Sequence, residues 1–271
     1  MGLFHWKKKT PPVQSAPCAQ QMSYRGANLQ GIGSRSEQQD AFAFVNLLDV
    51  RSIQEHGLLA IAADGMGGMQ GGAFAAQTAV ACIRAAFQDM DMSENIPEQL
   101  MQGFHTADDR IFQELHGLGG STAVACIFYH EKLWFASVGD SCLFLKRGTD
   151  LLRINREQNI LHEQYWDALQ SSQLFMDTDP DDREAQAVSQ FLGMGGLSEI
   201  DAFYRPLSLQ NGDILLLCSD GVEGVLSEED ILFALARSTP QEMCSDLEQM
   251  ILQKNKRYQD NYTALIVQCI Y

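Results

Sequence analysis

Four aspartates stand where apolar segments of the sequence begin or end: Asp40, Asp64, Asp220 and Asp260. Asp64, for example, follows the uncharged run 58–63 and precedes Gly65. Taken singly, each aspartate fits an ordinary turn or helix cap. If the segments lie side by side, however, the carboxylates converge and repel one another unless divalent cations or shared protons compensate.

The glycines that follow Asp64 favour the second interpretation. Gly65 and four more glycines lie within eight residues of this aspartate. Glycine lets main-chain carbonyl groups approach a ligand closely, and carboxylate and carbonyl oxygens are the ligands that hard divalent cations prefer. The residues alone leave two hypotheses open, a cation site and a set of turn residues in a protein without metal.

The elements that must position these aspartates follow from apolar periodicity. Runs typical of strands cover 22–33, 41–45, 58–63, 121–129, 133–138, 142–145, 214–218 and 263–269. Helical spacing predicts helices over 70–89, 98–116, 160–169, 184–191, 227–237 and 240–254. Three strands follow one another between residues 121 and 145 with hairpin-length breaks, which indicates an antiparallel meander and an α+β fold.

Composition narrows the class of protein. The 271 residues carry a net charge of −16, which argues against binding to nucleic acid or to an anionic membrane. No apolar run approaches the ~20 residues of a membrane helix. Seven cysteines without a CxxC pair indicate reduced thiols, a cytoplasmic location and no zinc site.

The chain is expected to form one catalytic domain over residues 22–271. Residues 1–21 contain three prolines and a lysine run among polar residues, and they are predicted to be a disordered tail. Residues 155–200 are polar and rich in Gln, Asp and Glu, so this segment is predicted to be a surface insertion or lid.

Six short blocks, in order along the chain, resemble those of the metal-dependent serine/threonine protein phosphatases in their bacterial form, the PPM or type 2C family. The blocks are Arg35-Ser36-Glu37-Gln38-Gln39-Asp40, Ala63-Asp64-Gly65-Met66-Gly67-Gly68, Gly120-Ser121-Thr122-Ala123, Val138-Gly139-Asp140-Ser141, residues 212–222 around Ser219-Asp220-Gly221, and Asp260-Asn261-Tyr262-Thr263. Each block is a weak signal, but their common order makes the resemblance specific.

The resemblance implies a four-layer αββα sandwich of two antiparallel sheets flanked by helices, with two Mn²⁺ or Mg²⁺ ions between the sheets. By position, Asp64 would bridge the ions, Gly65 would offer its carbonyl, and Asp220 and Asp260 would complete the ligand set. Asp40 would lie beside the ions as a ligand and orient the water, and Arg35 would bind the substrate phosphate. The implied reaction is hydrolysis of phosphoserine and phosphothreonine by a metal-activated water.

The implied partners are phosphorylated proteins, substrates of a serine/threonine kinase, and the enzyme is expected to be a monomer. Some positions depart from the family. Gly117 stands where the family has an aspartate for a third ion, which argues against a third site, and Glu157-Gln158 replaces the usual start of the lid. These departures motivate an alternative, a weakly active or inactive phosphatase-like module that binds a phosphoprotein. No general acid is identified; His116 and His162 are candidates by position alone.

Overall fold

The computed structural model describes residues 21–66, 71–171 and 184–271. The predicted tail, apart from residue 21, lies outside these ranges. So do Gly67, Gly68 and most of the central part of the predicted lid. The statements below concern the described residues.

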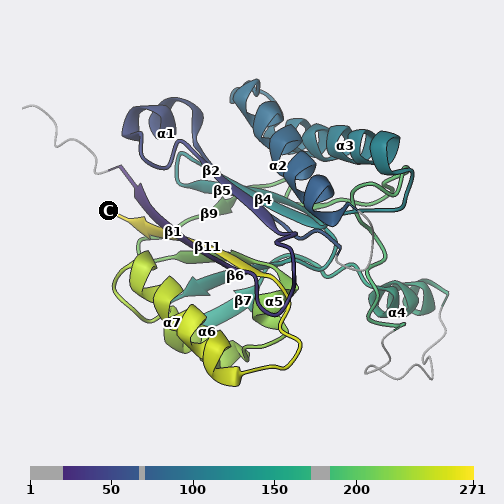
Figure 1. Ribbon diagram of the computed structural model, residues 1–271. Coiled ribbons are helices and arrows are strands. Elements are labelled where there is room, and N and C mark those ends of the chain that lie inside the picture. Colours follow the sequence, from purple (N-terminus) through teal and green to yellow (C-terminus); the bar gives the residue numbers. More distant parts are fainter. Residues whose placement is uncertain (1–20, 67–70, 172–183) are drawn as a thin grey trace, which may run out of the picture.

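Two antiparallel sheets pack face to face (Figure 1). The first sheet has the order β1 (Ser23–Gly31), β11 (Tyr262–Ile270), β10 (Ile214–Cys218), β6 (Cys142–Arg147) and β7 (Asp150–Arg153). The second sheet has the order β2 (Ala41–Val45), β3 (Leu58–Ala63), β4 (Ala123–Tyr129), β5 (Lys132–Val138) and β8 (Asp201–Ala202), and β9 (Leu207–Ser208) also pairs with β5. The first sheet pairs the first strand of the chain with the last, and the second joins β2 to strands more than 150 residues further along, which only long-range contacts can specify.

Helices cover the outer face of each sheet (Figure 1). The second sheet is covered by α2 (Gly72–Gln88) and α3 (Ile96–Leu115), and the first by α5 (Asp220–Glu223), α6 (Glu228–Ala234) and α7 (Pro240–Lys254). Two helices lie apart from these layers, α1 (Val50–His56) and α4 (Ile160–Gln170). The predicted four-layer αββα sandwich is confirmed.

Three apolar layers hold the sandwich together. One lies between α2, α3 and the second sheet, one between the two sheets, and one between the first sheet and its helices. Strand β3 contributes to two of them: Leu59 and Ile61 face the helices, whereas Leu58 and Ala60 face the other sheet. A strand covered on both faces reads as a continuous apolar run, which explains why residues 58–63 show no alternation.

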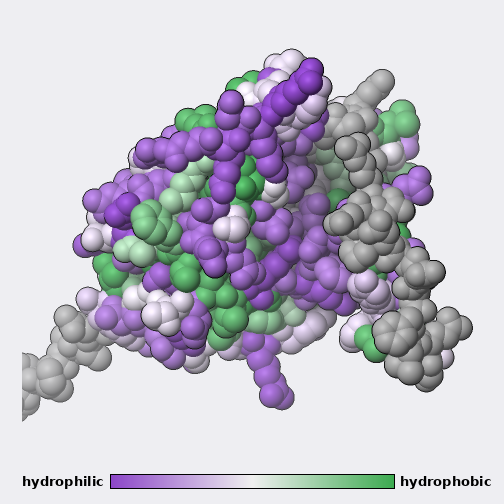
Figure 2. Space-filling view, turned by 90° about the horizontal axis from the view of Figure 1, so that it is seen from below, coloured by the Kyte–Doolittle hydropathy of each residue, from purple (hydrophilic) through white to green (hydrophobic). Residues whose placement is uncertain are grey.

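Most predicted elements are found within a few residues of their predicted ends. Residues 184–191 are an exception, because they form a turn and isolated bridges, Asn159 with Val188 and Ser121 with Leu192, in place of the predicted helix. The surface seen in Figure 2 carries hydrophobic residues in small patches between hydrophilic ones. The six described cysteines are free and buried, as expected for reduced thiols.

Candidate metal centre

The strand pairing brings the four aspartates to one end of the sandwich. In the second sheet Ala41 pairs with Ala63, so that Asp40 and Asp64 are neighbours at the ends of β2 and β3. In the first sheet Cys218 pairs with Ala264, which places Asp220 and Asp260 at the ends of β10 and β11. Each sheet therefore contributes two carboxylates.

These carboxylates are close enough to act on one another. The Asp64 carboxyl lies within hydrogen-bond reach of those of Asp40 and Asp220. Arg35 donates from Nη2 to Asp260 Oδ2 at 2.5 Å, and the charges of Asp220 and Asp64 also act on its guanidinium. Arg35 and Asp260 stay partly exposed, with 45% and 37% of their side-chain surface accessible. The structure thus brings Arg35 and all four aspartates to one site.

Burial and mutual repulsion disfavour full ionisation of this cluster. Desolvation raises the pKa of Asp40 to about 6, and the charge of Asp220 adds to the effect. The pKa of Asp64 is raised well above its usual range, mainly by desolvation and then by the charges of Asp40 and Asp220. The cluster therefore needs either protons or additional positive charge near neutral pH.

An unpartnered oxygen indicates where such charge fits. Asp40 is 6% exposed, and its Oδ1 is buried without a hydrogen-bond partner among the described residues. Within those residues no group of three or more His, Cys, Asp or Glu side chains already has the arrangement of a metal site, and Asp260 is paired with Arg35. Buried carboxylate oxygens with a spare lone pair fit a hard divalent cation.

Asp40 is held by a link between the two sheets. Ser219 Oγ donates to Asp40 Oδ2 at 2.9 Å and accepts from the Thr263 main-chain N–H at 3.0 Å. The main-chain N–H of Ser219 donates to the Thr263 carbonyl at 3.0 Å. With one carboxylate oxygen held in this way, the other has a defined direction.

The main chain around Asp64 is also anchored. Ser121 Oγ and the Thr122 main-chain N–H both donate to the Asp64 carbonyl oxygen, each at 2.9 Å. A β-carbon on Gly65 would lie 2.3 Å from the Gly72 carbonyl oxygen and 2.5 Å from that of Gln39. Only glycine fits at position 65, as the predicted tight turn requires.

The structure adds Asp140 to the site, in the turn between β5 and β6. Desolvation, with a contribution from Asp220, raises its pKa to about 7. Arg153 donates to the Asp140 carbonyl oxygen at 2.8 Å and to Glu157 at 3.0 Å. The sequence contained a signal for this residue, because Asp140 also lies at the end of an apolar strand.

The buried carboxylate of Asp108, on α3, holds a loop that contacts the site. Both oxygens of Asp108 accept main-chain N–H groups, from Gly193 at 2.7 Å and from Gly195, Gly196 and Leu197 at 3.2–3.3 Å. The same loop contains Leu192, which exchanges two main-chain hydrogen bonds with Ser121. Helix α3 is thereby connected through this loop to the residue that holds Asp64. Sequence reasoning missed Asp108, although a charged residue on the apolar face of a helix was the signal.

Asp108→Ala is expected to lower the free energy of unfolding by about 3 kcal/mol, because it leaves buried N–H donors without an acceptor. Asp108→Asn keeps one acceptor oxygen and should lose less. Denaturant unfolding measures both, and Asp109→Ala, on the exposed side of α3, is the matched control. An Asp108→Ala variant as stable as the control would show that the loop does not depend on this carboxylate.

The lid segment is fastened to the site by buried amide side chains. Gln158 Oε1 accepts from the Gly139 N–H at 2.7 Å, and Asn155 Oδ1 accepts from the Leu143 N–H at 2.8 Å. The prediction of a surface insertion is therefore incomplete, since Asn155, Gln158 and Asn159 are buried.

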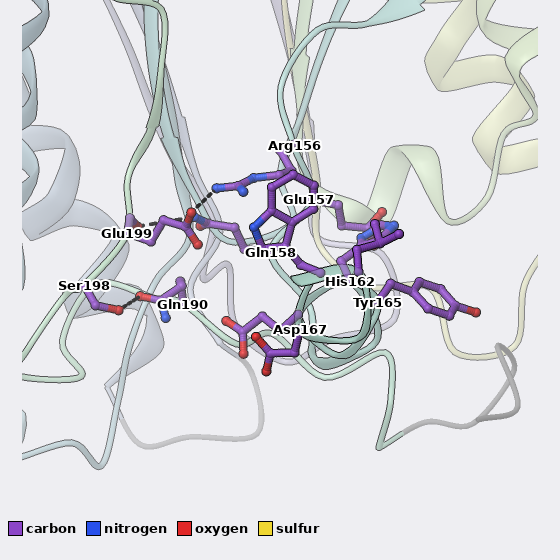
Figure 3. Close-up of a pocket in the computed structure, with 12 residues that line it drawn as sticks. Arg156, Glu157, Gln158, His162, Tyr165, Asp167, Gln190, Ser198 and Glu199 are labelled. Carbon is purple, nitrogen blue, oxygen red and sulfur yellow. Dashed lines mark hydrogen bonds and ion pairs between the residues drawn. The ribbon is translucent and has the colours of Figure 1, made fainter. Parts of the chain in front are cut away.

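Between α4 and residues 184–199 the lid lines a partly open cavity of about 480 Å³ (Figure 3). Arg156 and Glu199 form an ion pair on one side of it, and Ser198 donates to Gln190. His162 lines this cavity, whereas His116 ends α3. No contact among the described residues brings either histidine to the aspartates.

The raised pKa values predict a pH-dependent response to cations. Aspartate in an unfolded chain titrates near 4, so between about pH 4 and pH 7 the folded cluster binds more protons than the unfolded chain. The stability of the cation-free protein should therefore fall as the pH rises through this range. Added Mn²⁺ should raise the melting temperature more at about pH 7.5 than at about pH 5, because it binds ionised carboxylates. Thermal unfolding at both pH values tests this, and an equal shift would contradict it.

Known proteins resemble this chain in sequence. The family model described as "Protein phosphatase 2C" matches residues 31–257. The chain is 28% identical over 224 residues to the serine/threonine phosphatase stp of Listeria welshimeri, covering 78% of this chain and 84% of that protein.

Solved structures share the fold. PppA of Pseudomonas aeruginosa, described as a key regulatory component of T6SS, superposes with a TM-score of 0.73 at 26% identity, over 92% of this chain and 98% of that one. The catalytic domain of PstP in complex with two manganese ions gives a TM-score of 0.72 at 22% identity, over 92% and 100% of the two chains. Because the family model matches most of the length of this chain, the chain belongs to the protein phosphatase 2C family.

Proposed function

We propose that this protein phosphatase hydrolyses phosphoserine and phosphothreonine in proteins, with two divalent ions held by Asp40, Asp64, Gly65, Asp220 and Asp260. The observation that carries the proposal is the convergence of two carboxylates from each sheet beside Arg35. A site built for protein binding alone would have no reason to bury carboxylates that repel one another.

The ions are Mn²⁺ or Mg²⁺ in this proposal. Hard oxygen donors suit both, and the donor set does not separate them. When bound, such a pair supplies the Lewis acidity that activates water and neutralises phosphoryl oxygens. The proposal includes no third ion of the family type, since Gly117 offers no carboxylate where the family has an aspartate.

The chain's own residues divide the remaining tasks. Arg35 has five N–H donors and is engaged on one carboxylate oxygen, so it can turn toward the oxygens of a bound phosphate. Asp40, with Oδ2 held by Ser219, offers Oδ1 to a proton of the attacking water. Ser121 and Thr122 keep the Asp64 main chain in place while its carboxylate binds.

The proposal extends to the substrates, the location and the oligomeric state of the enzyme. The substrates are proteins phosphorylated by a serine/threonine kinase, acted on in the cytoplasm by a single-domain monomer. Among the described residues, no helix is both long enough and apolar enough to cross a bilayer. The sequence predicts neither nucleic acid nor membrane as a partner.

Metal titration with a phosphothreonine peptide tests the proposal. Turnover should be absent in excess chelator and should return with Mn²⁺ or Mg²⁺ in a saturable way. Full activity in chelator would overturn the metal-dependent reaction. Tight peptide binding without turnover at saturating Mn²⁺ would instead favour the alternative, a phosphatase-like binding module.

A further inference from the structure

Two exposed cations lie on the turn that leads into Asp260. Helix α7 ends at Lys254, and the left-handed conformation of the next residue, Asn255 (φ of 46°), turns the chain away from the helix. Lys256 and Arg257 follow, both exposed, and the Arg257 guanidinium lies 5.1 Å from the centre of the Tyr258 ring. Tyr258 is itself 79% exposed. The turn therefore presents two positive charges and an aromatic ring to solvent.

This turn is part of the rim of the aspartate cluster. The main-chain N–H and the Oγ of Ser34 both donate to the Gln259 carbonyl at 2.8 Å, which holds the Arg35 loop against residues 259–260. Lys256 Nζ donates to the Gly224 carbonyl, and the Gly224 N–H donates to the Asp220 carbonyl at 2.8 Å. Lys256 thus contacts the segment that follows Asp220, and Arg257 lies three residues before Asp260 in the turn that the Arg35 loop contacts.

The positive charge of this rim is not neutralised by an ion pair. Lys254, two residues earlier, is paired with Asp230 at 2.8 Å. In the part of the chain that the structure describes, Lys256 contacts a carbonyl and Arg257 an aromatic ring, and neither has a carboxylate partner. The exposed acids of the neighbouring segments are Glu37, Glu223, Glu228 and Glu229, and within the described ranges no ion pair joins any of them to Lys256 or Arg257. In a chain of net charge −16, these two cations therefore keep their charge available to an acidic ligand.

We propose that Lys256 and Arg257 are a docking site for acidic side chains that flank the phosphorylated residue of the substrate. This rests on the proposed function, because the flanking residues of a phosphoprotein reach this rim only when its phosphate lies beside Arg35. Charges on the rim of an interface act mainly on the association rate and on its salt dependence. The substrates are accordingly acidic phosphopeptide segments, which the net negative charge of the whole chain would otherwise repel.

The experiment compares three phosphothreonine peptides that differ only in their flanks, which carry aspartate, alanine or lysine, with a small aryl phosphate as reference. For the wild-type enzyme with Mn²⁺, kcat/KM should be about 10-fold higher for the acidic than for the basic peptide. This preference should shrink in about 0.3 M salt, where the Debye length is short. Hydrolysis of the aryl phosphate, which has no flanks, should show no such dependence.

Charge reversal assigns the preference to the rim. Arg257→Glu should cancel or invert the order of the peptides, Arg257→Lys should preserve it, and both should hydrolyse the aryl phosphate like the wild type. Arg84→Glu, on the exposed side of α2, reverses one charge away from the rim and should leave the order unchanged.

Equal kcat/KM values for the three peptides, or a preference that Arg257→Glu leaves intact, would overturn this inference while aryl phosphate turnover still supports the phosphatase. Loss of all turnover in the wild-type enzyme with Mn²⁺ would instead refute the proposed function.

Discussion

Asp64→Asn should lower kcat/KM by at least about 1,000-fold, which corresponds to ~4 kcal/mol of transition-state stabilisation. Asp64 is the carboxylate in contact with both Asp40 and Asp220, so its loss removes the group shared by the two halves of the site. Asparagine has nearly the same shape, and the main-chain contacts of residue 64 to Ser121 and Thr122 do not involve the carboxylate. The loss should therefore come from cation binding and not from misfolding.

Two measurements separate these causes. Calorimetric titration should show weaker Mn²⁺ binding by Asp64→Asn. Thermal unfolding without cations at neutral pH should show a variant at least as stable as the wild type, since one of several repelling carboxylates has been removed. Asp89→Asn, at the exposed end of α2, is the control. Wild-type turnover by Asp64→Asn would refute the assignment of this residue.

Arg35→Ala is expected to reduce kcat/KM about 100-fold, mostly through a higher KM, because a charge-assisted contact to the phosphate is lost. Arg35→Lys keeps the charge but not the planar fork, so it should recover only part of the loss. Arg35→Ala also releases Asp260 from its ion pair. Mn²⁺ should then bind the alanine variant no more weakly than the wild type.

Steady-state kinetics with a phosphothreonine peptide, together with Mn²⁺ titration, tests this combination. A lower affinity for Mn²⁺ with unchanged KM would show that Arg35 organises the aspartates and does not bind the phosphate. Arg84→Ala, remote from the site on α2, provides the baseline for loss of an exposed arginine.

The elements that the sequence predicted well carry their signals locally. Helix α7 begins at Pro240 because Thr239 and Glu242, only three residues apart, form a capping box. Strand β10 is a run of five apolar residues preceded by the Asn211-Gly212 turn. The four aspartates were found for the same reason, since each lies within three residues of a predicted apolar run.

What the sequence could not show depends on contacts between distant residues. The loop that binds Asp108 lies more than 80 residues further along the chain, and no local pattern links the two. Residues 184–191 have helical spacing, but main-chain pairing of Val188 with Asn159 and of Leu192 with Ser121 prevails. The order of strands in the first sheet joins the first and last strands of the chain, which no short motif encodes.

Each sheet contributes two aspartates, so ions bound by all four would cross-link the two sheets. The sheets otherwise meet mainly through apolar side chains. Removing the ions would weaken the mechanical cohesion of the sandwich at one edge as well as stop its chemistry. A cell that restricts its free manganese or magnesium would thus shorten the lifetime of this polypeptide as well as slow its turnover.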